Sequence, residues 1–103
     1  MLLDRNINTN GKYALINLRK INEDPLKPQG LIELLAANPQ SIEFGAVGAP
    51  DEFWVIKLKD KYALAALRAY ADAAEADDPE YAAEVRSLAD RSGCHSPFCK
   101  TPD

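Results

Sequence analysis

The chain has 103 residues, the usual size of one domain with a single hydrophobic core. Hydrophobic residues make up 47% of it and charged residues 27%, which is typical of a folded globular protein. The net charge of −4 repels nucleic-acid phosphate and so disfavours direct binding to nucleic acid. No apolar run reaches the roughly eighteen residues of a membrane span. We therefore expect a protein of the cytoplasm that does not bind membranes.

The N-terminal part contains one short helix and one ambiguous segment. Residues 1–11 are polar and rich in asparagine, and they are predicted to form a flexible arm. Residues 12–21 fit both strand alternation and helical spacing; we favour a strand, because an Asn-Gly turn signal precedes them and they contain tyrosine and isoleucine. After a proline-containing break, the leucines and isoleucine of 31–35 predict a short helix that ends before Pro39.

The middle of the chain is predicted to form a hairpin. Residues 41–44 have the pattern of a short strand, 45–51 that of a loop, and 52–58 that of a longer strand. Alternation places Trp54 on the face that we expect in the core, and Phe53 and Val55 on the opposite face. That opposite face is either half covered by the short helix or presented to a partner subunit. Because exposed Phe53 and Val55 would form an apolar patch, we expect the protein to self-associate there as a homo-oligomer.

Two amphipathic helices are predicted in the C-terminal part. Asp60 can cap the first, over residues 62–75, whose apolar stripe comprises Ala63, Ala66, Leu67, Tyr70, Ala71 and Ala74. Asp78 and Pro79 begin the second, with a stripe of Tyr81 or Ala82, Val85, Leu88 and Ala89 and a stop at Gly93. The fold class is α+β: a small antiparallel sheet of two or three strands, a short helix and this C-terminal helix pair. One domain is expected over residues 12–93, followed by a tail over 94–103.

Acidic residues gather where the two predicted helices meet. Between positions 72 and 90 there are seven acids against one base, Arg86. Glu75 and Asp77 lie near the C-terminal end of the first helix, where negative charge is unfavourable, whereas acids suit the start of the second. Such a surface is commonly only solvated, but it can also dock a basic partner. The candidate partner-binding residues are Asp72, Glu75, Asp77, Asp78, Glu80 and Glu84.

The tail holds the residue types that ligate soft metals. Cys94, His95 and Cys99 supply three ligands where a structural zinc site needs four, and adjacent Cys and His side chains diverge. We therefore expect reduced thiols, no bound metal and no cofactor. His95 is the only histidine, and a proline-containing tail is a poor place for a general base. These patterns predict that the protein is not an enzyme.

Aromatic and basic residues around the predicted strand 52–58 suggest an alternative. Trp54 could stack on a nucleotide base while Lys57, Lys59 and Lys61 hold its phosphates. A tryptophan on an alternating strand is, however, more often part of the core. Nucleotide binding is therefore kept as the second hypothesis.

Three segments, Glu52–Ala63, the alanine-rich residues 65–74 and Ser96–Asp103, resemble small uncharacterised proteins of tailed bacteriophages and prophages. The resemblance spans residues 42–103, and that group has no established activity to carry over. It implies an accessory protein that binds and blocks a host component, as anti-CRISPR-like and other anti-defence inhibitors do. The acidic residues would then contact a host protein with a basic nucleic-acid-binding surface. The alternative becomes a sponge that sequesters a signalling nucleotide.

Overall fold

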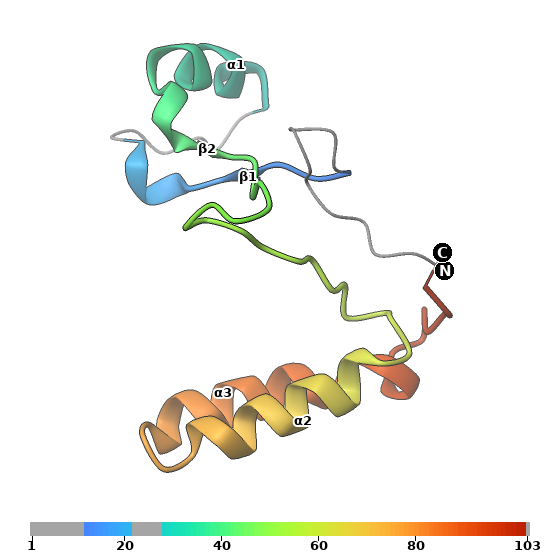
Figure 1. Cartoon of the computed structure of the whole chain (residues 1–103). Coiled ribbons are helices and arrows are strands. Elements are labelled where there is room, and N and C mark those ends of the chain that lie inside the picture. Colours follow the sequence, from blue (N-terminus) through green and yellow to red (C-terminus); the bar gives the residue numbers. More distant parts are fainter. Residues whose placement is uncertain (1–11, 22–27, 103) are drawn as a thin grey trace. The chain divides into compact units, whose positions relative to one another are not determined.

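A computed structural model describes residues 12–21 and 28–102, so the predicted arm over 1–11 lies outside the described residues. The chain divides into two compact units (Figure 1). The described residues up to Val55 form the N-terminal unit, and those from Ile56 onwards form the C-terminal unit. The single domain expected over 12–93 therefore contains two compact units. That the two units form one domain stays a prediction.

The N-terminal unit combines a minimal sheet with one helix. Its elements are β1 (Leu15–Ile16), the 3-10 turn η1 (Leu18–Lys20), α1 (Pro28–Ala37), the 3-10 turn η2 (Pro39–Ser41) and β2 (Ile42–Glu43). The helix ends before Pro39 as predicted, and the Asn38 side-chain amide donates a hydrogen bond to the Leu34 carbonyl at 2.9 Å. With its antiparallel sheet of two strands and its separate helices, the chain has the predicted α+β fold.

The predicted hairpin of 41–44 with 52–58 is wrong. β2 pairs instead with β1, placing Leu15 opposite Glu43 and Ile16 opposite Ile42, so the strand favoured within 12–21 is confirmed only at two residues. Residues 52–57 run without regular secondary structure (Figure 1). Strand pairing depends on contacts distant in sequence, here with β1, which the local alternation of 52–58 does not determine. Gly45 (φ 61°) and Gly48 (φ 85°) adopt left-handed conformations in the intervening loop.

The faces of the segment 53–56 are also the reverse of those predicted. Trp54, expected in the core, is 59% exposed, and Ile56 is 37% exposed. Phe53 and Val55, expected on the open face, are half-buried. The Phe53 ring lies directly on Gly45: a β-carbon at that glycine would come within 2.9 Å of Phe53 Cγ. Glycine therefore creates the space that the Phe53 ring occupies.

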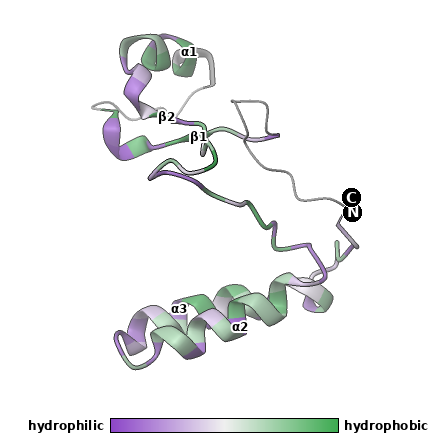
Figure 2. Ribbon diagram, in the orientation of Figure 1, coloured by the Kyte–Doolittle hydropathy of each residue, from purple (hydrophilic) through white to green (hydrophobic). Residues whose placement is uncertain are grey.

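The C-terminal unit is built around a helical hairpin of α2 (Ala63–Ala74) and α3 (Pro79–Ala89). The predicted cap at Asp60 is wrong: its carboxylate accepts a hydrogen bond from the Tyr62 N–H at 2.8 Å, but Tyr62 precedes α2, and no side chain of the described residues caps the first turn of that helix. The Asp78 carboxylate accepts the Tyr81 N–H at 3.1 Å and caps α3, which confirms the predicted start at Asp78 and Pro79. The connection between the helices is hydrophilic (Figure 2).

Small residues hold the two helices together. The buried residues are Ala63, Leu64 and Ala71 on α2, and Ala82, Val85 and Ala89 on α3. Alanines at this seam let the helix backbones approach closely. The predicted stripe of the first helix is wrong at Ala66 and Tyr70, which are both exposed, Tyr70 at 53%. Of the two residues offered for the second stripe, Ala82 is buried and Tyr81 is 44% exposed, because a seam packed by alanines leaves no room for tyrosine rings.

The helix stop predicted at Gly93 is also corrected. α3 ends at Ala89, and Gly93 (φ 54°) instead begins the 3-10 turn η3 (Gly93–His95). Its N–H donates to the Leu58 carbonyl at 2.8 Å, and a β-carbon there would lie 2.8 Å from Leu64 Cβ. Gly93 therefore serves close packing against the start of α2.

The predicted tail returns to the body of the C-terminal unit. The Lys100 N–H donates to the Lys59 carbonyl at 2.9 Å, and the Lys61 N–H donates to the Lys100 carbonyl at 3.0 Å. These bonds form a single parallel bridge beside Asp60. The end of the described chain is thus hydrogen-bonded to the segment that leads into α2.

Candidate functional site

Arg86 neutralises part of the acidic cluster at the helical hairpin. Its guanidinium donates to Glu75 at 2.6 Å and to Asp72 at 3.1 Å, and so joins α3 to the C-terminal end of α2. The hydrogen bond to Glu75, and then that to Asp72, raises the pKa of Arg86 above its ordinary value. The unfavourable acids expected at the end of the first helix are therefore partly compensated. Two of the candidate binding residues, Asp72 and Glu75, are engaged within the chain.

A pair of tyrosines lies on the hairpin. The hydroxyls of Tyr70 on α2 and Tyr81 on α3 share a hydrogen bond of 2.7 Å. Their rings meet edge to face, with centroids 6.0 Å apart and an interplanar angle of 70°. The Tyr70 bond raises the pKa of Tyr81, and burial and the negative charges of Asp78 and Glu84 act in the same direction. Sequence reasoning assigned both tyrosines to the helix stripes and missed this pair.

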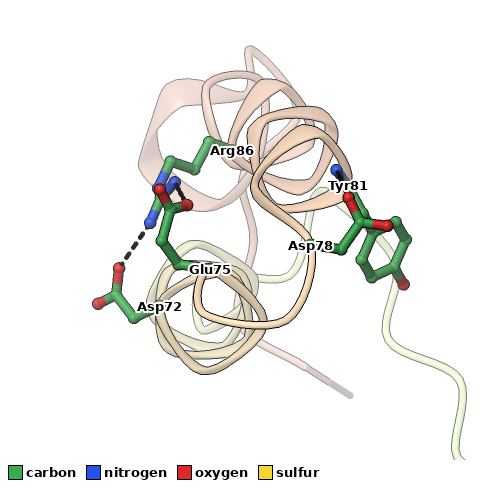
Figure 3. Close-up of polar contacts among 5 residues, drawn as sticks. All are labelled: Asp72, Glu75, Asp78, Tyr81 and Arg86. Carbon is green, nitrogen blue, oxygen red and sulfur yellow. Dashed lines mark hydrogen bonds and ion pairs between the residues drawn. The ribbon is translucent and has the colours of Figure 1, made fainter.

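The two polar groups occupy opposite sides of the hairpin. Figure 3 shows Arg86 with Asp72 and Glu75 on one side, and Asp78 with Tyr81 on the other. We call the second side the tyrosine face and define it by Tyr70, Asp78, Tyr81 and Glu84. The six predicted acids therefore do not form one surface. Asp72 and Glu75 lie with Arg86 on one side of the hairpin, and Asp78 lies on the other.

Three acids keep their charge free for a partner. Asp77, Glu80 and Glu84 are exposed, and within the described residues no basic side chain forms an ion pair with them. Asp78 is exposed as well, but its carboxylate holds the first turn of α3. Glu84 also lines an open hollow on α3 together with Tyr81, Val85, Leu88 and Arg91. The hollow therefore combines apolar surface with one acid and one base.

The residues of the nucleotide alternative belong to different units. Trp54 lies in the N-terminal unit, and Lys57, Lys59 and Lys61 lie in the C-terminal unit. Trp54 is open to stacking because it is 59% exposed. The Lys61 ammonium lies over the Tyr62 ring at 5.1 Å, and the Lys59 carbonyl accepts the Lys100 N–H. A common nucleotide site for these residues stays a prediction.

Phe53 and Val55, the residues predicted for self-association, are half-buried within their own unit. The ring of Phe53 lies against Gly45, so part of its apolar surface is already covered. Self-association through these two residues stays a prediction. They expose less apolar surface to a second copy than the sequence pattern suggested.

The tail residues Cys94 and Cys99 are exposed, free thiols. Cys94 and His95 lie in η3, and Cys99 follows one further turn, in which its N–H donates to the Ser96 carbonyl at 3.2 Å. Within the described part of the chain, no group of three or more histidine, cysteine, aspartate or glutamate side chains is placed to hold a metal ion.

Comparisons with known proteins found no relative. No family model matches the chain, and no curated protein or solved structure is significantly similar to it. None of the helices in the described residues has the length and apolar character needed to cross a membrane. The candidate site is therefore assigned from the contacts and exposure of this chain's own residues.

Proposed function

We propose that this chain is a non-catalytic binding protein whose helical hairpin attaches to a basic surface of a host protein. The observation that carries the proposal is the set of exposed acids Asp77, Glu80 and Glu84, with which no basic side chain of the described residues forms an ion pair. Charge complementarity of this kind speeds association and selects the partner. The tyrosines beside these acids supply the residue type enriched at the centres of interfaces.

The resemblance to small phage and prophage proteins gives the proposal its setting. Such a protein acts in the host cytoplasm as an accessory factor and needs no cofactor. A host protein that binds nucleic acid carries a basic surface of the kind that the acids fit. The proposed role is therefore that of an anti-defence inhibitor, anti-CRISPR-like in action, which occupies that surface in place of the nucleic acid.

The test is capture of a host protein from nuclease-treated lysate by the tagged chain. Asp77→Lys with Glu80→Lys is expected to abolish capture, because it reverses the charge of two of the three exposed acids that form no ion pair within the described residues. Asp78 is left intact, since its loss would remove the α3 cap. The matched control is Glu33→Lys with Asp51→Lys, which changes the net charge equally at exposed residues of the N-terminal unit.

Two outcomes contradict the proposal. If the Asp77 and Glu80 variant still captures the host protein, the acids form only a solvated surface. If the control variant loses capture equally, the effect comes from net charge and not from the hairpin. Circular dichroism of both variants shows whether the helices are retained.

The exposure of Trp54 favours a second candidate, a sponge for a signalling nucleotide. In this proposal the exposed indole of Trp54 stacks on the nucleotide base. A ligand at a hundred times its dissociation constant adds about 2.7 kcal/mol of stability, so thermal-shift screening with cyclic and linear nucleotides tests it. The absence of a shift with every nucleotide would exclude the sponge.

The proposed homo-oligomer has its own test, which is the mass of the protein in solution. Phe53 and Val55 are its proposed contacts, so a variant with both replaced by serine should shift the mass toward that of the monomer. A wild-type chain that stays monomeric at high concentration would contradict self-association.

A further inference from the structure

The tyrosine face combines aromatic and acidic groups in a fixed arrangement. The hydroxyl bond of 2.7 Å and the edge-to-face contact hold the rings of Tyr70 and Tyr81 against each other while both stay about half exposed. Tyrosine provides a large contact surface at a low cost in conformational entropy. The hydrogen bond lowers this cost further, because it restrains both rings before any partner arrives.

Negative charge borders the two rings. The Asp78 carboxylate is fixed by its bond to the Tyr81 N–H, and Glu84 lies on the wall of the hollow that Tyr81 also lines. Leu88 adds apolar surface to the hollow, and Arg91 also lines it, so the negative charge nearest the rings comes from Asp78 and Glu84 and not from the hollow as a whole. The opposite side of the hairpin differs, since Arg86 there already occupies Asp72 and Glu75 (Figure 3).

From this arrangement, and resting on the proposed function, we propose that the tyrosine face binds arginine side chains of its partner in preference to lysine. A guanidinium is planar, stacks on aromatic rings and can donate two parallel hydrogen bonds to a carboxylate. A lysine ammonium matches the negative charge but offers no plane to stack. The tyrosine rings, and not the acidic charge alone, therefore define the partner's chemistry.

The test compares an oligo-arginine with an oligo-lysine peptide of equal length, each titrated calorimetrically into the full chain. The arginine peptide is expected to bind about tenfold more tightly, as one or two stacked guanidinium contacts would give. Tyr81→Ala should remove most of this preference. Tyr62→Ala, which removes an equally exposed tyrosine outside the tyrosine face, should leave it unchanged.

A second variant keeps the test decisive if Tyr81→Ala unfolds the hairpin. Glu84→Gln changes only a charge at an exposed position, and it should weaken binding of the arginine peptide. Equal affinity for the two peptides, a preference that survives Tyr81→Ala in a folded hairpin, or arginine-peptide binding unchanged by Glu84→Gln would overturn the inference. Host capture that depends on Asp77 and Glu80 without any arginine preference would refute the inference alone; an arginine preference without host capture would refute only the proposed function.

Discussion

Tyr70 and Tyr81 share a hydroxyl hydrogen bond of 2.7 Å across the helical hairpin, while both rings stay open to solvent. This contact links the outer edge of α2 to the first turn of α3, next to the cap at Asp78. It stabilises the hairpin at the same place where the proposed partner would contact it. Stability and binding should therefore respond together when the pair is altered.

The phenol of Tyr81 should titrate above its ordinary pKa of 10.0. Its bond to Tyr70 and the nearby acids favour the neutral form, so this contribution to stability is fully present below pH 10.0 and is lost as the pH rises through the raised pKa. Difference titration of tyrosinate absorbance between wild type and Tyr81→Phe measures the value. A Tyr81 phenol that ionises at or below pH 10.0 would contradict the contact.

Replacing Arg86 by methionine should lower the melting temperature slightly. The change removes two exposed ion pairs and leaves Asp72 and Glu75 at the negative end of α2. Because the pairs are exposed, the difference from wild type should shrink in high salt. Arg68→Met is the control, since Arg68 forms no ion pair within the described residues. Equal losses in the two variants at every salt concentration would exclude a specific role for Arg86.

Gly93→Ala should lower the free energy of unfolding by at least about 1–2 kcal/mol, the cost of a left-handed alanine. The added β-carbon would also lie 2.8 Å from Leu64 Cβ and 3.2 Å from the Lys61 carbonyl. Chemical denaturation measures the loss, and faster amide exchange at Lys61 and Lys100 should accompany it. Gly30→Ala is the control, because a β-carbon at that helical position meets nothing within 4 Å. An unchanged Gly93→Ala variant would refute the close packing at η3.

Ala82→Leu should destabilise the hairpin by about 1–3 kcal/mol, as expected for overpacking a filled core. Ala82 is fully buried at the seam between α2 and α3, so a larger side chain must push the helices apart. The neighbouring residue Ala83 is exposed, and Ala83→Leu should change stability by no more than about 0.5 kcal/mol. Thermal unfolding of the two variants separates these cases. Equal stability would contradict the alanine seam.

The helices could be predicted from the sequence because their signals are local. Capping by Asp78, the proline at the first position of α3 and the break before Pro39 each act within one turn of chain. The pairing of β2 depends on contacts distant in sequence, and there the prediction failed. Alternation over 52–58 had the pattern of a strand, but residues 52–57 have no regular secondary structure, and the Phe53 ring packs on Gly45 instead of facing away from the chain.

The sequence predicted which residue types gather at the candidate site, but not how their side chains contact one another. Counting acids located the charge at the hairpin, but it could not show that Arg86 reaches across to Asp72 and Glu75. Assigning Tyr70 to the buried stripe followed from helical spacing, which does not reveal that an alanine seam excludes large rings. One signal for the tyrosine pair was available in the sequence. Antiparallel helices bring together residues that lie at similar distances before and after their connection, and Tyr70 and Tyr81 lie at such positions.

The most direct measurement is NMR mapping of amide shifts while the oligo-arginine peptide, and then the captured host protein, is added to the labelled chain. If the tyrosine face is the binding surface, the largest changes will fall on Tyr70, Tyr81 and Glu84, with little change at Arg86 on the opposite side. Changes centred on Arg86, or spread evenly over the C-terminal unit, would contradict it.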